Sequence, residues 1–159
     1  METTDLKISI IGAGNMGGAI ARGLSKGTTV QASNIRVSDI SADHLQALQT
    51  FAPEISISRT NAEIIKDADI IILAVKPWLV ETVAKEIEHK IDYKKQIIVS
   101  IAAGVDFEKL SELFDTEASI FRVIPNTAID ILESVTTIAA QKATKEQQDL
   151  VLTLFAEMG

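Results

Sequence analysis

The chain has 159 residues, with 15 Lys or Arg against 22 Asp or Glu, so its formal net charge is −7. An acidic chain without a basic run is not suited to bind nucleic acid or an anionic membrane through phosphate groups. Its 47% hydrophobic content is typical of a soluble globular protein and too high for a disordered chain. The absence of cysteine excludes disulfides, thiolate catalysis and Cys-ligated metals, and favours a cytoplasmic protein.

Short runs of β-branched residues alternate with segments of helical period, which is typical of βαβ units that form a parallel sheet. The predicted strands are residues 8–11, 35–38, 55–57, 70–74, 97–100 and 119–123. Apolar residues at three- and four-residue spacing predict helices over 16–25, 42–48, 80–91, 107–114 and 150–158. Two capping boxes, Thr60-x-x-Glu63 and Thr144-x-x-Gln147, mark helix starts. We therefore expect one α/β domain of Rossmann type, doubly wound, with a mainly parallel sheet and helices on both faces.

A glycine motif, Gly12-Ala13-Gly14-Asn15-Met16-Gly17, directly follows the first predicted strand and opens a helical segment. In that context Gly12 permits a tight turn, Gly14 lets a pyrophosphate approach the backbone, and Gly17 brings helix and strand together. The N–H groups at the helix start then face the phosphates. The motif predicts a dinucleotide site, and a glycine-rich turn without a ligand is the alternative.

An acidic residue is expected about 20 positions after these glycines, at the end of the second strand, and Asp39 lies there. Its carboxylate can accept hydrogen bonds from the adenosine ribose hydroxyls and would repel a 2′-phosphate, which favours NADH. The alternative is that Asp39 only precedes a helix, for which Ser41 is a good N-cap.

Further polar or small residues follow the later strands, and in doubly wound sheets such loops share one ligand crevice. Lys76 follows the fourth strand, small residues from Ser100 to Gly104 follow the fifth, and Asn126 and Thr127 follow the sixth. Each also has a structural explanation: an exposed lysine, a tight turn and a Pro-Asn turn. Both histidines, His44 and His89, lie among polar residues and are expected to be solvated. No metal site is predicted.

Four stretches together resemble the cofactor-binding domain of the pyrroline-5-carboxylate reductase family, and the resemblance covers essentially the whole chain. They are Ile10–Gly17, Ala74–Pro77, Ser100–Val105 and Arg122–Thr127. This resemblance implies reduction of the cyclic imine 1-pyrroline-5-carboxylate to L-proline, in proline biosynthesis, by hydride from NADPH or NADH. The imine would be the partner, with neither nucleic acid nor membrane involved.

Carried over by position, the resemblance implies a set of cofactor-binding residues. They are Ile11, Gly12, Ala13, Gly14, Asn15, Met16, Gly17, Asp39, Asn61, Ala74, Val75, Lys76, Pro77, Ala102 and Ala103. The resemblance does not identify a catalytic residue, and Lys76, Asn126 and Thr127 are the nearest candidates.

The sequence departs from the family pattern in three places. The pair Asp39-Ile40 replaces a pair in which an arginine holds the 2′-phosphate of NADPH, so the preference tilts towards NADH. Residues 128–133 replace a proline and a glycine-rich segment, so that loop is expected to sit differently. Nothing in residues 1–159 corresponds to the family's C-terminal helical domain, which dimerises. We therefore expect a cofactor-binding domain, poorly active alone, of a homo-oligomeric enzyme.

Two other functions stay open from the sequence. One is another dehydrogenase of the 6-phosphogluconate and β-hydroxyacid dehydrogenase superfamily. The other is a non-catalytic module that senses a dinucleotide or binds a partner, since the apolar stripe from Leu150 to Met158 has no evident cover and is expected to be exposed.

Overall fold

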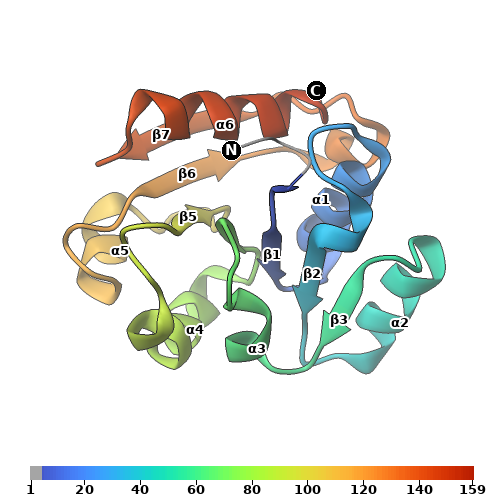
Figure 1. Ribbon diagram of the computed structural model, residues 1–159, viewed down its shortest axis with the longest axis horizontal. Coiled ribbons are helices and arrows are strands. Elements are labelled where there is room, and N and C mark those ends of the chain that lie inside the picture. The colour runs from blue at the N-terminus through green and yellow to red at the C-terminus, as the bar shows by residue number, and fades with distance from the viewer. Residues whose placement is uncertain (1–4) are drawn as a thin grey trace.

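The computed structural model describes residues 5–159, apart from the side chain of Thr127. Its centre is a seven-stranded sheet in the order β3-β2-β1-β4-β5-β6-β7 (Figure 1). The strands are β1 (Ile8–Ile11), β2 (Ile35–Ser38), β3 (Ser56–Ser58), β4 (Ile70–Leu73), β5 (Ile97–Ser100), β6 (Ile120–Ile124) and β7 (Thr137–Gln141). Strands β1 to β6 are parallel, and the strand order reverses between β1 and β4. The predicted doubly wound Rossmann-type fold is therefore confirmed.

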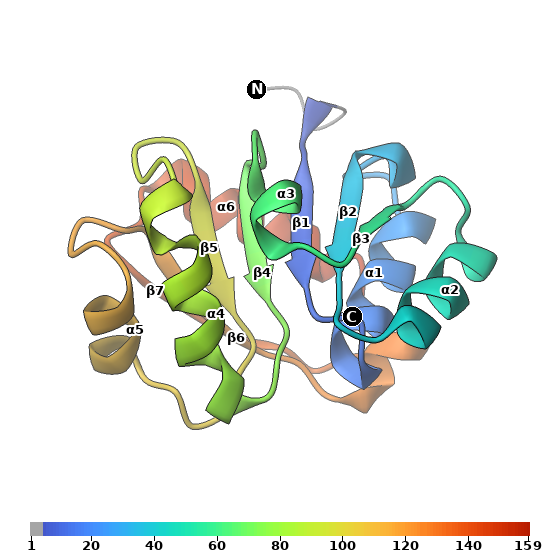
Figure 2. The same ribbon diagram turned by 90° about the horizontal axis from the view of Figure 1, so that it is seen from below.

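Helices cover both faces of this sheet. On one face lie α1 (Asn15–Lys26), α2 (Ala42–Phe51) and α6 (Lys145–Ala156), and on the other α3 (Asn61–Ile65), α4 (Val80–Ile87) and α5 (Phe107–Leu113). Figure 2 shows α3 and α4 in front of the strands and α6 behind them. Successive strand residues face opposite layers, so β4, which is buried on both faces, is apolar throughout. Within residues 5–159 no helix has the length and apolar character that crossing a bilayer would need.

Short 3₁₀ helices complete the connections: η2 (Ala32–Asn34), η3 (Pro77–Leu79), η4 (Glu88–Lys90) and η5 (Thr127–Ile131). The helix expected over 80–91 is accordingly shorter, because α4 ends at Ile87 and the chain tightens into η4. The apolar spacing continues to Ile91, which is buried, and so gave no sign of this change.

Strand β7 was not predicted from the sequence. It pairs antiparallel with β6, with Ile124 opposite Thr137 and Ile120 opposite Gln141. Its residues are half-buried or exposed, and two of them, Ala139 and Ala140, are alanines, which are depleted in strands. Pairing with β6, rather than intrinsic propensity, makes this segment a strand.

One of the two predicted capping boxes is wrong. Thr144 accepts a hydrogen bond from the Gln147 N–H and the Gln147 side chain accepts one from the Thr144 N–H, as expected at the start of α6. Thr60 makes no such side-chain bond at the start of α3. There the Glu63 carboxylate accepts from the Ser58 hydroxyl at 2.6 Å instead. A nearby hydroxyl thus competes successfully for the N3 carboxylate.

The apolar stripe of the last helix is buried, which contradicts the exposed surface expected from the sequence. Val151, Leu154, Phe155 and Met158 belong to the same core as α1 and the sheet, and none is more than 1% exposed. Leu152, on the opposite face of α6, is a large hydrophobic side chain that is 52% exposed. Because β6 and β7 extend the sheet beneath it, α6 has a partner within the chain.

The C-terminal end of α6 is fixed by one carboxylate. Oε1 of Glu157 accepts hydrogen bonds from the Thr28 N–H and the Thr29 N–H, both at 2.8 Å, and from the Thr28 hydroxyl at 3.0 Å. Burial under this turn favours the neutral acid, but hydrogen bonds from Thr29 and Thr28 outweigh it and hold the pKa of Glu157 below its ordinary value. A side chain at Gly27 would overlap the same carboxylate.

We predict that Glu157→Gln lowers the free energy of unfolding at pH 7 by about 1 kcal/mol, because hydrogen bonds to a charged acceptor are roughly twice as strong as those to a neutral one. Since the folded-state pKa is lowered, this stabilisation is present above the ordinary carboxyl pKa of 4.5 and is lost as the pH falls through the folded value. Urea denaturation at pH 7 and pH 3 measures it. The matched variant Glu112→Gln, at an exposed position of α5, should change stability at neither pH.

Candidate functional site

The candidate site lies where the strand order reverses, beyond the carboxyl ends of β1 and β4. The loops that follow these strands are in backbone contact, since the Ala74 N–H donates to the Ile11 carbonyl at 2.8 Å. Gly12 has φ +106°, and a Cβ there would overlap the Ala74 carbonyl. Only glycine fits this turn, as the motif predicted.

The start of α1 combines tight packing on one side with open space on the other. A Cβ on Gly17 would overlap the Gly12 carbonyl oxygen, whereas a Cβ on Gly14 would meet no heavy atom within 4 Å. Gly14 is the N-cap, and among the described residues no side chain caps this helix end. First-turn N–H groups beside open space fit a dinucleotide pyrophosphate.

Asp39 is held against the glycine loop. One carboxylate oxygen, Oδ2, accepts from the Ala13 N–H at 2.6 Å, and Oδ1 accepts from the Ser41 N–H at 2.7 Å. Ser41 in turn caps α2, its hydroxyl accepting from the His44 N–H at 3.2 Å. Asp39 thus precedes a capped helix and also borders the glycine loop, so its position is compatible with both explanations that the sequence left open.

Asn61 bridges two elements beside Asp39. Its Oδ1 accepts from the Ser38 hydroxyl at 2.7 Å, and its Nδ2 donates to Oε2 of Glu86 on α4 at 2.8 Å. The side-chain amide is thus oriented by β2 and α4, with one N–H left for a further acceptor.

The structure brings the remaining candidates to the same sheet edge with different exposure. Ile11 and Ala102 are buried, Ala74 and Val75 are half-buried, and Lys76, Pro77 and Ala103 are exposed. Asn126 is exposed and is the N-cap of η5, accepting from the Ala128 N–H at 3.0 Å. Thr127 begins η5, and its side chain lies outside the described part of the structure.

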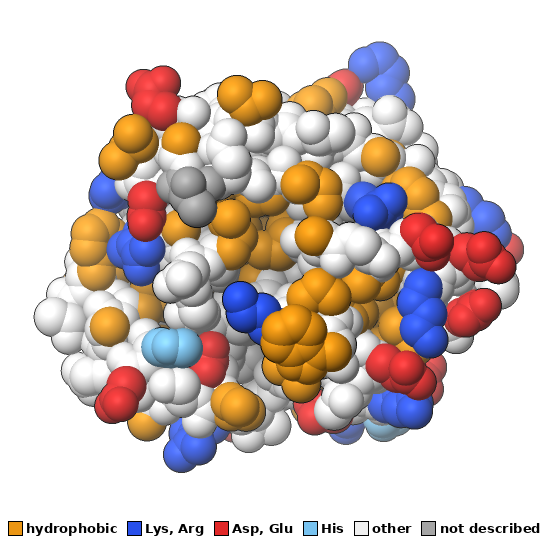
Figure 3. Space-filling view, turned by 180° about the vertical axis from the view of Figure 1, so that it is seen from behind, with side chains coloured by type: hydrophobic (Ala, Val, Ile, Leu, Met, Phe, Trp, Pro, Cys, Tyr) orange, Lys and Arg blue, Asp and Glu red, His pale blue; other side chains and the backbone are white. Residues whose placement is uncertain are grey.

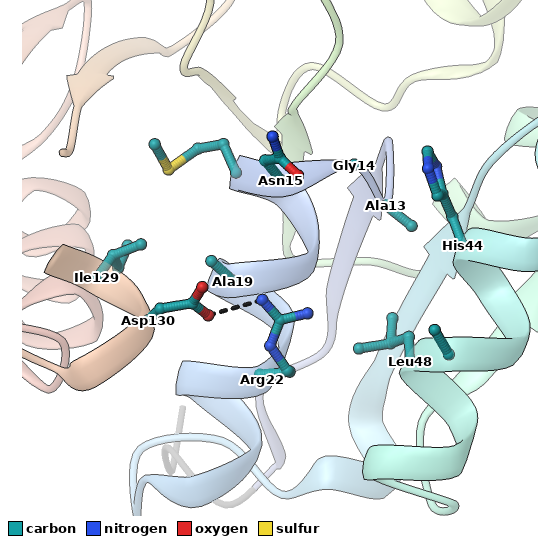
Figure 4. A pocket seen from close by; sticks show the side chains of 11 residues that line it. Ala13, Gly14, Asn15, Ala19, Arg22, His44, Leu48, Ile129 and Asp130 are labelled. Atoms are coloured by element: carbon teal, nitrogen blue, oxygen red, sulfur yellow. Dashed lines mark hydrogen bonds and ion pairs between the residues drawn. The ribbon is translucent and has the colours of Figure 1, made fainter. Parts of the chain in front are cut away.

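A pocket of about 340 Å³ runs from the glycine loop along α1, between α2 and η5 (Figure 4). Gly14, Asn15 and His44 border its upper part, and Arg22 crosses it to pair with Asp130 at 2.6 Å.

His44 was expected to be only a solvated surface residue. It is 54% exposed, but its Nδ1 lies 3.5 Å from Oδ2 of Asp39. Sequence spacing gave no signal for this pair, because α2 brings it together.

Hydrophobic side chains gather at the same edge of the sheet. Trp78 and Leu79, which follow β4, are 74% and 39% exposed, and Ile131 of η5 is 71% exposed. Figure 3 shows a face of the molecule that is hollowed near its centre, with hydrophobic side chains inside and below the hollow. Such a concave, partly apolar surface suits a ligand that carries flat rings. Within residues 5–159, no cluster of three His, Asp or Glu side chains could hold a metal ion.

Comparison with known proteins places this geometry among oxidoreductases. A family model described as "NADP oxidoreductase coenzyme F420-dependent" matches residues 7–104. The chain is 36% identical over 154 residues to a pyrroline-5-carboxylate reductase of Methanosarcina acetivorans, covering 96% of this chain and 56% of that protein. It is 34% identical over 151 residues to pyrroline-5-carboxylate reductase 3 of Danio rerio, covering 95% of this chain and 51% of that protein. The chain thus spans about half the length of the curated relatives that it matches.

A solved structure agrees with these relatives. The chain superposes on the crystal structure of Plasmodium falciparum pyrroline carboxylate reductase, which has NADP bound, with a TM-score of 0.87 and 25% identity. The match covers 100% of this chain and 56% of that one. The same fold therefore holds a dinucleotide in a similar protein.

We predict that alanine affects stability differently at two glycines of the loop. Gly17→Ala places a methyl group against the Gly12 carbonyl and should lower the free energy of unfolding by about 2–4 kcal/mol. Gly14→Ala faces open space at an ordinary φ of −71° and should stay within about 0.5 kcal/mol of the original chain. Urea denaturation of the two variants checks this contrast, which equal stabilities would contradict.

Proposed function

The chain belongs to the family described as NADP oxidoreductase coenzyme F420-dependent, and we propose that it is the dinucleotide-binding half of a pyrroline-5-carboxylate reductase. The proposed reaction reduces the C=N bond of 1-pyrroline-5-carboxylate to give L-proline. The observation that carries the proposal is the 36% identity to such a reductase across 96% of the chain. The uncapped helix start at the switch point supports it, because it is suited to the coenzyme that this reaction needs.

The proposed coenzyme site follows the sheet edge. The N–H groups at the start of α1 bind the pyrophosphate, and Asp39 and Asn61 border the adenosine ribose. Ala74 to Pro77 border the nicotinamide ribose, and Ala102 and Ala103 leave room for the nicotinamide ring. The coenzyme, NADPH or NADH, supplies the hydride when bound. The chain's own groups position it and limit access of water.

The candidates for polar contact with the substrate are Lys76, Asn126 and Thr127. Lys76 is the N-cap residue of η3 and is exposed, so its ammonium can reach an anionic group of a ligand. Asn126 uses its Oδ1 within η5 and keeps its amide N–H groups for donation. These assignments are part of the proposal.

Because the chain spans about half the length of its relatives, we propose that the remaining half supplies the substrate pocket and the contacts of a homo-oligomer. A cytoplasmic location is proposed from the absence of cysteine. The alternative of a partner-binding module has less support, because the apolar stripe of the last helix that motivated it is buried against α1 and the sheet.

We predict that NADH or NADPH quenches the fluorescence of Trp78 in a saturable way. Trp78 is the chain's single tryptophan and lies just beyond Lys76, so bound dihydronicotinamide can accept its excitation energy.

Gly14→Ala should weaken coenzyme binding about tenfold or more, since the added methyl group occupies the space where the pyrophosphate approaches. Unchanged affinity in a folded Gly14→Ala variant would contradict the proposed phosphate position.

We also predict that the 159-residue chain alone turns over poorly while it binds coenzyme, because correct placement of the imine depends on the other half. The turnover rate is measured by chromatographic detection of the proline formed from pyrroline-5-carboxylate and NADPH. Efficient turnover by this chain would show that the substrate pocket lies within residues 1–159.

A further inference from the structure

The carboxylate of Asp39 already has partners on both of its oxygens. The Ala13 and Ser41 N–H groups donate to it at 2.6 and 2.7 Å, and its side chain is only 12% exposed. These bonds fix the carboxylate between the glycine loop and α2 but leave its negative charge in place. A 2′-phosphate on an adenosine ribose bound at the end of β2 would meet that charge.

His44 is placed to offset the negative charge of Asp39. Its Nδ1 lies 3.5 Å from Oδ2 of Asp39, and its ring, 54% exposed, borders the pocket that begins at Gly14. Histidine is the side chain whose charge normally changes between pH 5 and 8. The charge that a phosphate meets at this edge therefore depends on the protonation of His44.

Other charged groups surround His44 without changing charge in this range. Asp43 precedes it on α2, and Arg22 of α1 is paired with Asp130 of η5 at 2.6 Å in the same pocket. Arg59, after β3, donates from its Nη2 to the Ile40 carbonyl at 2.7 Å. Carboxylates and guanidinium groups keep their charges near neutral pH. Among the described groups here, only His44 can act as the variable charge.

Resting on the coenzyme site proposed above, we infer that His44 determines which dinucleotide the site accepts. Protonated His44 pairs with Asp39 and also attracts a 2′-phosphate, so NADPH and NADP⁺ bind well. Neutral His44 leaves Asp39 uncompensated, so NADH and NAD⁺ are preferred. The resulting specificity depends on pH, and an acidic residue after β2 does not by itself make the site specific for NADH.

The test is calorimetric titration of the 159-residue chain with NADP⁺ and with NAD⁺ at pH 6.0 and 8.5, at equal ionic strength. We expect the ratio Kd(NAD⁺)/Kd(NADP⁺) to be about fivefold larger at pH 6.0, a size consistent with one partly screened charge near the phosphate. The 2′-phosphate also changes charge near pH 6, and the variant His44→Gln reports that contribution alone. In His44→Gln the ratio Kd(NAD⁺)/Kd(NADP⁺) should differ by less than about twofold between pH 6.0 and pH 8.5.

The chain provides a matched control and a competing explanation. His89 is the second of the two histidines and lies exposed in η4, so His89→Gln should keep the original pH dependence. If His44→Gln keeps it too, the inference is wrong. If His44→Gln binds NADP⁺ normally at pH 6.0 and Arg59→Gln does not, Arg59 holds the phosphate and the inference is again wrong. If neither coenzyme binds the original chain, the proposed function itself fails.

Discussion

The close approach of the Gly12 and Gly17 backbones positions everything at this sheet edge. A Cβ on Gly17 would overlap the Gly12 carbonyl, and a Cβ on Gly12 would overlap the Ala74 carbonyl. These contacts bring β1, the first turn of α1 and the loop after β4 together at the point where the strand order reverses. With larger residues α1 would move away from the sheet, and its first N–H groups would no longer lie beside the open space at Gly14. The site thus depends on backbone packing before it depends on any polar side chain.

A second set of contacts fixes the polar groups relative to that turn. Asp39 joins the Ala13 and Ser41 N–H groups, while Asn61 joins Ser38 to Glu86. Groups from β2, α3 and α4 are therefore oriented without a ligand, which lowers the entropy lost when one binds. The same contacts give Asp39 a structural role in addition to the ligand-binding role proposed for it.

The sequence predicted the parts of this structure that follow from local patterns. Short β-branched runs between helical segments revealed β1, β2, β4 and β5 with at most one residue of error, and the glycine motif located the helix start. The sequence did not reveal β7, which is a strand because it pairs with the edge of β6. The burial of α6 likewise depends on how distant segments pack, whereas the proximity of His44 to Asp39 depends on the turn that Ser41 caps at the start of α2. Thr60 shows that even a local motif fails when a neighbour such as Ser58 competes for the same carboxylate.

Residues 128–133, one of the three places where the sequence departs from the family pattern, are anchored to α1. Ile129 of η5 is fully buried, and Asp130 of η5 pairs with Arg22 of α1 at 2.6 Å. At the other end of η5, Leu132 adopts a left-handed conformation with φ +61°, and the Asn126 N–H donates to the Ser134 hydroxyl at 3.2 Å. Asn126 caps η5 by accepting from the Ala128 N–H at 3.0 Å, and η5 is held to α1 by the Arg22–Asp130 pair. The residue proposed to face the substrate and the glycine loop are therefore both positioned by α1.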